Sequence, residues 1–427
     1  NAFNGAKFTF STKEENTAPF MNDINAFKNS LNFTVDTSLG GGDTFTIPTS
    51  GSETYAYKVT TSDGYTSSNI TGDHTITFPT GAGIHTIYIE GTFPKFNFYN
   101  TVDKDKITSI NTWGDITYSL NQQSAFHGCS NLTSLADDIN WINSVTNCLQ
   151  MFKDSSLTTL PSAMTLASLT AGSSMFQNNS LTSLPNAMTL ASLTGGDSMF
   201  RGNSLTSLPS AMTLASLTGG SLMFYGNSLT SLPSVMTLES LENGDSMFSS
   251  NSLTTLPSVM TLASLTNGSS MFLNNSLTSL PSGMILASLT SGYAMFYNNS
   301  LTALPSTMTL ASLTNGSLMF YQNNLTALPS GMTLASLTNG SSMFNGNSLT
   351  TLPSAMTLAS LTNGFLMFTN NSLTTLPSGM ALASLTTGTN MFRDNSLTAL
   401  PSDMTLASLT VAGSMFRDNS LTTLPSS

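Results

Sequence analysis

The dipeptide Met-Phe recurs every 24 residues from Met151 to Met415, without an insertion or a deletion. A fixed period of this length means that each unit cannot bury its apolar face alone and must stack on its neighbours. The period therefore predicts a solenoid in which residues 24 apart lie one above another. The apolar positions of the unit recur in register and predict a continuous core, as in Met175, Phe176, Leu181, Leu184, Met188, Leu190 and Leu193.

Within each unit, the segment Leu-Thr-x-Leu-Pro is the best strand candidate. Pro185 and its equivalents lack a backbone N–H and suit the end of a strand, whereas Gly172 and its equivalents suit the bend that follows. Asn179 and its equivalents precede each Leu-Thr by two residues. Buried Asn side chains in a column can hydrogen-bond the loop backbone of the same and adjacent turns. We therefore expect one short strand, an irregular return and an Asn ladder in each turn.

Residues 1–102 predict a domain of short β-strands. Runs of alternating apolar and polar residues are separated by Gly, Pro, Asp, Asn and Ser, which is typical of a sandwich. The runs are Lys7–Phe10, Phe33–Val35, Thr44–Ile47, Tyr55–Val59, Thr75–Phe78 and Ile84–Ile89. The chain is therefore predicted to be mainly β, with this domain at its N-terminal end.

Residues 103–150 are predicted to connect the two parts and to cap the solenoid. The first turn, which contains Trp141, is atypical because 26 residues separate its Phe from the next Phe. Terminal repeats of a solenoid are expected to differ in this way, since they shield the core from water. The side chains expected to close this end are Ile107, Ile110, Trp113 and Ile116.

Two cysteines lie in this capping region, Cys129 and Cys148. They either form a disulfide that staples the first turn or are separate core thiols. No comparable cap is recognisable before Ser427. We therefore expect that the chain continues or that a partner covers the last turn, for example another copy in a head-to-tail filament.

Two segments carry resemblances to known families. Residues 125–135, Ala-Phe-His-Gly-Cys-Ser-Asn-Leu-Thr-Ser-Leu, resemble the Ala-Phe-x-x-Cys-x-x-Leu-x-x-Ile signature of BspA-type (treponemal) leucine-rich repeats. Later units are similar, with Met for Ala and Asn for Cys, so the resemblance covers residues 124–427. Residues 55–64, 72–76 and 83–94 resemble a PKD-like immunoglobulin-type sandwich, although Thr-Ser-Asp-Gly at 61–64 replaces the usual Trp-Gly-Asp-Gly. The resemblance to BspA-type repeats implies a surface protein that binds host, matrix or neighbouring cells without catalysis.

The composition excludes further classes of function. Charged residues make up 8% of the chain, against about 25% in ordinary globular proteins. The net charge of −11 argues against nucleic-acid binding, and no apolar run approaches the roughly 20 residues that span a bilayer. The chain starts at Asn1 without a signal peptide, which we interpret as a mature processed chain or a fragment. We expect an extracellular or cell-surface location.

The residues that usually carry catalysis are sparse. The three histidines, His74, His85 and His127, fall on predicted strands or in a repeat position, and none has the spacing of a catalytic triad. We therefore expect no enzyme activity and no cofactor. Asp63 and Asp73 offer a weak calcium-site alternative, although ordinary turn chemistry explains them as well.

One variable position follows each Met-Phe, and another lies near each repeat Gly. Variation confined to a few register positions indicates a solvent-facing stripe, and Tyr and Arg are frequent interface residues. The candidate interaction stripe comprises Arg201, Tyr225, Tyr293, Tyr297, Tyr321, Phe365, Arg393 and Arg417. Nearly identical turns favour weak multivalent contacts with a protein or glycan over a single specific pocket.

Two other functions remain open from the sequence. A structural protomer of a surface filament or phage tail fibre is the first alternative. The second is an ice-binding solenoid, because an unbroken column of Thr runs along the repeats. Its members are Thr158, Thr182, Thr206, Thr230, Thr254, Thr278, Thr302, Thr326, Thr350, Thr374, Thr398 and Thr422. The residue after each Thr is Thr, Ser or Ala, which makes a second Thr column incomplete.

Overall fold

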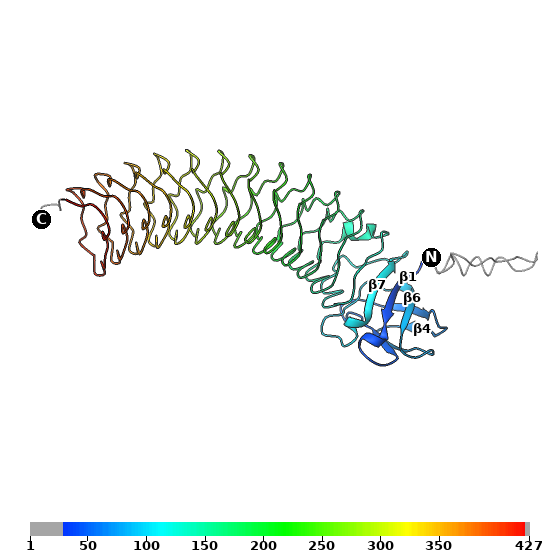
Figure 1. Ribbon diagram of the computed structural model, residues 1–427. Coiled ribbons are helices and arrows are strands. Elements are labelled where there is room, and N and C mark those ends of the chain that lie inside the picture. Colours follow the sequence, from blue (N-terminus) through cyan, green and yellow to red (C-terminus); the bar gives the residue numbers. More distant parts are fainter. Residues whose placement is uncertain (1–28, 423–427) are drawn as a thin grey trace, which may run out of the picture.

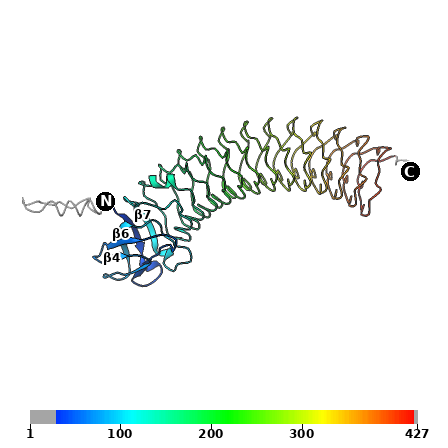
Figure 2. The ribbon, with the colours of Figure 1, turned by 180° about the vertical axis from the view of Figure 1, so that it is seen from behind.

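A computed structural model describes residues 29–422 of the chain. Figures 1 and 2 show a small sheet-containing region followed by a long, curved stack of turns. The elements among these residues are seven strands and three short 3-10 helices, so the protein is of the β class with almost no helix. The predicted run at Lys7–Phe10 lies outside the described residues.

Two antiparallel sheets form the N-terminal region. The larger has the strand order β4-β3-β6-β1-β7 and the smaller pairs β2 with β5. The strands are β1 (Leu31–Asp36), β2 (Thr44–Ile47), β3 (Ala56–Thr61), β4 (Thr66–Ile70), β5 (His74–Thr77), β6 (Ile84–Thr92) and β7 (Ile107–Thr112). The 3-10 helices are η1 (Thr37–Leu39), η2 (Lys104–Lys106) and η3 (Asn140–Ser144). The predicted runs within residues 29–102 all overlap strands, although Tyr55 and Phe78 lie one residue outside β3 and β5, whereas β4 was not predicted.

The edge strand β4 lacks the alternating pattern that identifies its neighbours. Only Ile70 of this strand is buried, and its other side chains are polar and largely exposed. A strand at the edge of a sheet needs no apolar face of its own once β3 supplies its hydrogen-bond partners. The pairing with β3, and not the local sequence, therefore defines β4.

Strand β7 joins the sheet to the stack of turns. It pairs with β1 on one side, and Ser109 forms a parallel bridge with Ser134 in the first turn on the other. The sequence placed this segment in the connection after residue 102, so the sheet extends further along the chain than predicted. Of the four residues expected to close this end of the stack, Ile107, Ile110 and Trp113 are at most 2% exposed, and Ile116 is partly buried against the core.

A phenylalanine column carries the core from the sheet region through the stack. Phe126 contacts Phe96, Phe98 and Trp113, with ring centroids 5.1–5.9 Å apart. From Phe126 to Phe416, each Phe stacks on the next, with centroids 5.4–5.7 Å apart and ring planes within 12°. The predicted in-register core is confirmed, since the repeated Met, Phe and Leu side chains are almost fully buried through most of the stack.

The predicted Asn ladder is also confirmed. Asn299 donates through Nδ2 to the carbonyls of Phe272 (2.9 Å) and Phe296 (3.1 Å), and its Oδ1 accepts from the N–H of Leu277 (3.0 Å). The same pattern recurs at the equivalent Asn of neighbouring turns, such as Asn323. Each Asn therefore joins the irregular backbone of two turns, where no sheet supplies partners.

The backbone ladder between turns lies elsewhere than predicted. Isolated parallel bridges connect the residue before each repeat Gly, as between Asn315 and Asn339, and no repeat contains an extended strand in the described stack. The segment around Leu-Thr-x-Leu-Pro makes one short bond per turn, Ser300 N–H to the Leu277 carbonyl (2.9 Å), and one long bond, Thr302 N–H to Thr278 (3.4 Å). The strand prediction was wrong because two successive residues there face solvent, which breaks the alternation of a strand.

The repeat glycines also have a different reason from the one expected. Gly172 does not adopt a positive φ. A Cβ added to it would lie 3.2 Å from the sulfur of Met199 in the next turn and 3.0 Å from a methyl group of Leu169. The position therefore requires a small residue because methionine packs against it, and not because the chain bends there.

The stack is curved because its turns are bonded unevenly. Figures 1 and 2 show turns crowded along one side of the arc and spread along the other. Four backbone bonds per turn run from the Gly to the second residue after Phe, as at Gly292, Ala294, Phe296 and Asn298 (2.9–3.0 Å). Residues 305–312, in contrast, have no backbone bond to another turn. Bonded backbones keep strand spacing, so the bonded side is expected on the inside of the arc.

Candidate functional site

The residue after each Met-Phe lies on the bonded side of the stack. Its carbonyl accepts a backbone bond from the preceding turn, as Tyr321 does from Asn298 (3.0 Å). The preceding Phe ring is buried, whereas nine of the twelve side chains that follow a Met-Phe are partly or fully exposed; Ser249, Asn345 and Thr369 are buried. We call these twelve positions the contact column. They are Lys153, Gln177, Arg201, Tyr225, Ser249, Leu273, Tyr297, Tyr321, Asn345, Thr369, Arg393 and Arg417.

The contact column gathers the cations and most tyrosines of the repeats. All four Lys and Arg residues within 151–427 belong to it, as do three of the four tyrosines. The eight acidic residues of the same range occupy other register positions. Since Arg and Tyr are enriched where proteins contact partners, this column is the candidate interaction site.

The first contact within the column joins Arg201 and Tyr225. The guanidinium carbon of Arg201 lies 5.5 Å from the centroid of the Tyr225 ring in the next turn. This distance is within the range of a cation–π interaction, which attracts a cation to the ring face. The pair is partly exposed, so it is ordered and still accessible.

The second contact joins Tyr297 and Tyr321. Their rings stack with centroids 5.0 Å apart and planes at 24°. Beside them, the amide of Asn298 donates to Oδ1 of Asn274 at 2.9 Å. The rings restrain each other, and rigid tyrosines offer contact area at a low entropic cost.

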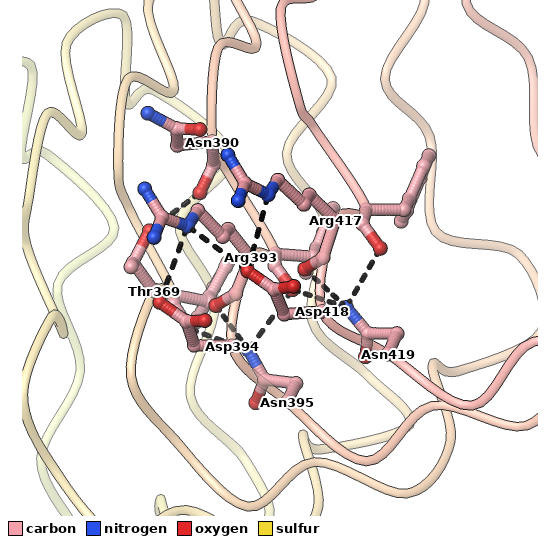
Figure 3. Close-up of polar contacts among 11 residues, drawn as sticks. Thr369, Asn390, Arg393, Asp394, Asn395, Arg417, Asp418 and Asn419 are labelled. Carbon is pink, nitrogen blue, oxygen red and sulfur yellow. Dashed lines mark hydrogen bonds and ion pairs between the residues drawn. The ribbon is translucent and has the colours of Figure 1, made fainter.

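The third contact is a charged cluster at Arg393 and Arg417, shown in Figure 3. Nε of Arg393 lies 3.3 Å from Oδ2 of Asp394 and 3.6 Å from Oδ2 of Asp418. Nε of Arg417 lies 3.3 Å from the same oxygen of Asp418. The carboxylates therefore lie within ion-pair distance of both Nε atoms, although Nε of Arg393 has no hydrogen-bond partner among the described residues, and the formal charges of the cluster cancel.

The remaining two members of the predicted stripe do not join these contacts. Tyr293 and Phe365 are 43% and 38% exposed, and both lie immediately after a repeat Gly, in a separate register position. They are three turns apart and do not contact each other. The predicted stripe is thus two columns, of which only the contact column brings its residues together.

The sequence prediction missed the carboxylate partners of the arginines. Asp394 and Asp418 have φ values of 55°, and the same position is Gly, Asn, Asp, Ser or Gln in other turns. Asn, Asp and Gly tolerate this left-handed conformation best. The signal that identifies these aspartates is the dipeptide Arg-Asp repeated 24 residues apart.

The predicted Thr column is exposed along its whole length. Within the described stack, the hydroxyl groups from Thr158 to Thr398 have no protein partner. A second Thr column, not singled out from the sequence, behaves differently. Thr290 donates its hydroxyl to the carbonyl of Thr266, and Thr314 donates to Thr290, both at 3.0 Å. That second column is structural, whereas the predicted one leaves its hydroxyls free for solvent.

The three histidines have structural surroundings. His74 is 2.8 Å from the Tyr65 hydroxyl, and His85 stacks on Phe78 with centroids 3.8 Å apart. His127 stacks beside Tyr99 at 5.0 Å. Burial lowers the pKa of His74, and burial followed by the charge of Lys153 lowers that of His127.

The weak calcium alternative gains no support from the surrounding residues. Asp63 accepts hydrogen bonds from Thr61 and Thr80. Burial raises the pKa of Asp63, but these hydrogen bonds lower it by more, so the pKa falls below the usual range. Asp73 accepts two bonds from Thr49, each 2.7 Å. Among residues 29–422, no three acidic, His or Cys side chains are grouped as metal ligands would be.

Cys129 and Cys148 are free, buried thiols and do not form the disulfide considered from the sequence. Cys129 occupies the position of the repeat Asn, and Cys148 that of the repeat Gly. The N–H of Cys148 donates to the carbonyl of Ala171 in the next turn at 2.9 Å, as the N–H of a repeat Gly does. The two side chains therefore belong to different columns of the same turn, and each fills the core.

Comparisons with models of known protein families and with curated proteins find no match to this chain. Within the described part of the chain, no helix has the length and apolarity that crossing a bilayer requires.

Proposed function

We propose that the protein is an extracellular or cell-surface adhesion protein that uses the contact column for multivalent binding. In this proposal the stack is a BspA-like leucine-rich repeat solenoid, and the N-terminal sheets form a PKD-like sandwich that caps it. The resemblance of residues 125–135 to the BspA-type signature supports this assignment. The observation that carries the proposal is the concentration of all repeat cations and most repeat tyrosines in one column.

The architecture suits weak, repeated contacts better than a single pocket. Twelve turns at a strand spacing of about 4.8 Å give a rod of roughly 60 Å. Contacts that recur along such a rod gain avidity, because each binding event raises the effective concentration for the next. The rod therefore provides both reach and several attachment points.

Bead adhesion tests the proposal directly. Beads that carry the chain are tested for retention on cells and on films of gelatin or polysaccharide. In the test variant, Arg201, Tyr225, Tyr297, Tyr321, Arg393 and Arg417 are all replaced by Ser, which Ser249 shows to be compatible with this position. We expect retention to fall to the level of uncoated beads.

The matched control replaces three exposed apolar residues of other columns by Ser. Val235, Val259 and Ile285 are 47–48% exposed and lie outside the contact column. This variant is expected to keep its retention. Equal losses in both variants, or no loss in the first, contradict the role of the column.

Ice binding is a second candidate that one observation favours, the exposed and unpartnered hydroxyls of the Thr158–Thr398 column. The arc in Figure 1 weighs against it, because a flat lattice is matched best by a straight face. Thermal hysteresis of the purified chain decides between ice binding and adhesion.

The filament alternative predicts fibres with a constant axial repeat in electron micrographs across a concentration series, whereas an adhesin gives single rods.

A further inference from the structure

The three ordered contacts of the column recur with a period longer than one repeat. Residues 201, 297 and 393 are 96 apart, as are residues 225, 321 and 417. Each contact is a pair of large side chains in adjacent turns, and the next pair follows four turns later. The pairs are Arg201 with Tyr225, Tyr297 with Tyr321, and Arg393 with Arg417.

The column positions between the pairs hold side chains that are mostly buried, so the surface is recessed there. Ser249 is 1% exposed, Asn345 7% and Thr369 3%, and only Leu273 is partly exposed. From Arg201 to Arg417 the column therefore alternates between two raised turns and two recessed turns. At a strand spacing of about 4.8 Å, successive pairs are about 19 Å apart.

The chemistry of the pairs favours a polar ligand. Asp394 and Asp418 cancel the charges of Arg393 and Arg417, and the repeats as a whole contain more acids than cations. Guanidinium and carboxylate groups held side by side offer donors and acceptors together, as hydroxyl groups require. Tyrosine adds an apolar ring and a hydroxyl at the same contact.

The backbone of this surface does not favour an extended peptide. Peptides often bind by adding a strand to a free sheet edge. Along the column, however, the N–H groups of Gly292, Ala294, Phe296 and Asn298 already bond to the next turn, and this pattern repeats. Three of the four recessed positions hold buried polar side chains, namely Ser249, Asn345 and Thr369, and so offer few apolar pockets for peptide side chains.

We propose that the contact column binds a linear, hydroxyl-rich polysaccharide that lies along the stack and engages the three pairs at intervals of four turns. This inference rests on the proposed adhesion function and specifies its ligand class. A repeating polymer presents the same groups at regular distances, so one chain reaches all three pairs. Binding by the three together exceeds binding by any one through avidity.

The spacing of the pairs is tested by deleting single repeats. Deletion of residues 247–270 removes one recessed turn, so that the second pair follows the first by three turns instead of four. Deletion of residues 175–198 removes one turn before the first pair and leaves every spacing unchanged. Both deletions join identical register positions, so the two variants are matched in length and in packing.

Affinity is measured by gel electrophoresis through hydroxyethyl cellulose, pullulan or alginate, and by binding to gelatin. We expect retardation by a neutral polysaccharide that is insensitive to salt, a loss of roughly tenfold or more for the 247–270 deletion, and little change for the 175–198 deletion. Circular dichroism of both variants verifies that the stack is retained.

Equal affinities of the two deletions overturn the proposal, because the pairs then act independently. Binding to alginate alone with a steep salt dependence overturns it in favour of an anionic ligand. Binding to gelatin alone, or to none of these probes, overturns the polysaccharide assignment. If the bead assay still depends on the contact column in that case, adhesion stands and only the ligand class fails.

Discussion

Replacement of Asn299 by Ala removes one step of the Asn ladder in the middle of the stack. The Leu277 N–H then loses the Oδ1 atom that it bonds at 3.0 Å. The carbonyls of Phe272 and Phe296 each lose one donor but keep another, from Asn275 (3.1 Å) and Asn323 (2.9 Å) respectively. The substitution therefore leaves one buried backbone group without a protein partner and weakens two others.

The expected loss of stability follows from these contacts. An orphaned buried N–H costs about 1–3 kcal/mol, and each lost bond to a carbonyl that keeps a second donor adds roughly 0.5–1 kcal/mol. We therefore expect the free energy of unfolding to fall by about 3 kcal/mol. The neighbouring residue offers a matched control, Asn298→Gly. Asn298 is exposed and has a φ of 55°, and Gly occupies the same position at 202, 226 and 346.

Urea titration followed by circular dichroism measures both variants. An unchanged slope of the transition shows that the same cooperative unit unfolds, so that a shift in its midpoint reports stability. We expect Asn298→Gly to cost less than about 1 kcal/mol, as exposed substitutions usually do. A loss below about 1 kcal/mol for Asn299→Ala, or equal losses in both variants, refutes the ladder as a source of stability.

Three further results are expected. Phe248→Ala interrupts the ring stack and is expected to cost about 3–5 kcal/mol, whereas Phe365→Ala is expected to stay within about 0.5 kcal/mol; similar urea midpoints contradict this. Burial raises the pKa of the thiols of Cys129 and Cys148. Both should therefore react with a thiol reagent only after denaturation. If both stay unreactive in denaturant, they form a disulfide. Burial and Lys153 lower the pKa of His127, so the unfolded chain binds its proton more readily and stability falls as pH drops below about 6.5. His127→Gln should reduce this fall, and an unchanged pH profile argues against the assignment.

Much of the candidate site could be predicted, because a strict period converts sequence positions into spatial columns. The sequence placed Arg201, Tyr225, Tyr321 and Arg417 in one stripe, and the structure places all four in the contact column. The stripe also included Tyr293, which lies in another register position. Which neighbours touch depends on side-chain direction and on the spacing of adjacent turns, and neither is encoded by variability alone.

The N-terminal region shows the limit of local pattern more clearly. Strands such as Thr44–Ile47 were predictable because one buried face imposes alternation on the sequence. Strand β4 lacks that alternation, and β7 was interpreted as a connection. Both are strands because β3 and β1 offer them hydrogen-bond partners. The β1–β7 pairing joins residues far apart in the chain, such as Val35 and Ile107, and a local pattern cannot show it. Strand β4 pairs with β3 across a short turn, but its exposed polar side chains give no alternating pattern to recognise.

The sequence by itself determined that the repeats stack in register, that Met, Phe and Leu form the core, and that Asn joins the turns. These features follow from a 24-residue period, since identical units bury identical faces. Only the tertiary structure decided which segment carries the backbone ladder. The same chain could bond its turns through either side. The Gly-to-Phe side forms four short bonds, and the missing side chain of Gly292 leaves room there for Met319 to pack. The curvature and the order of the contact column follow from that choice.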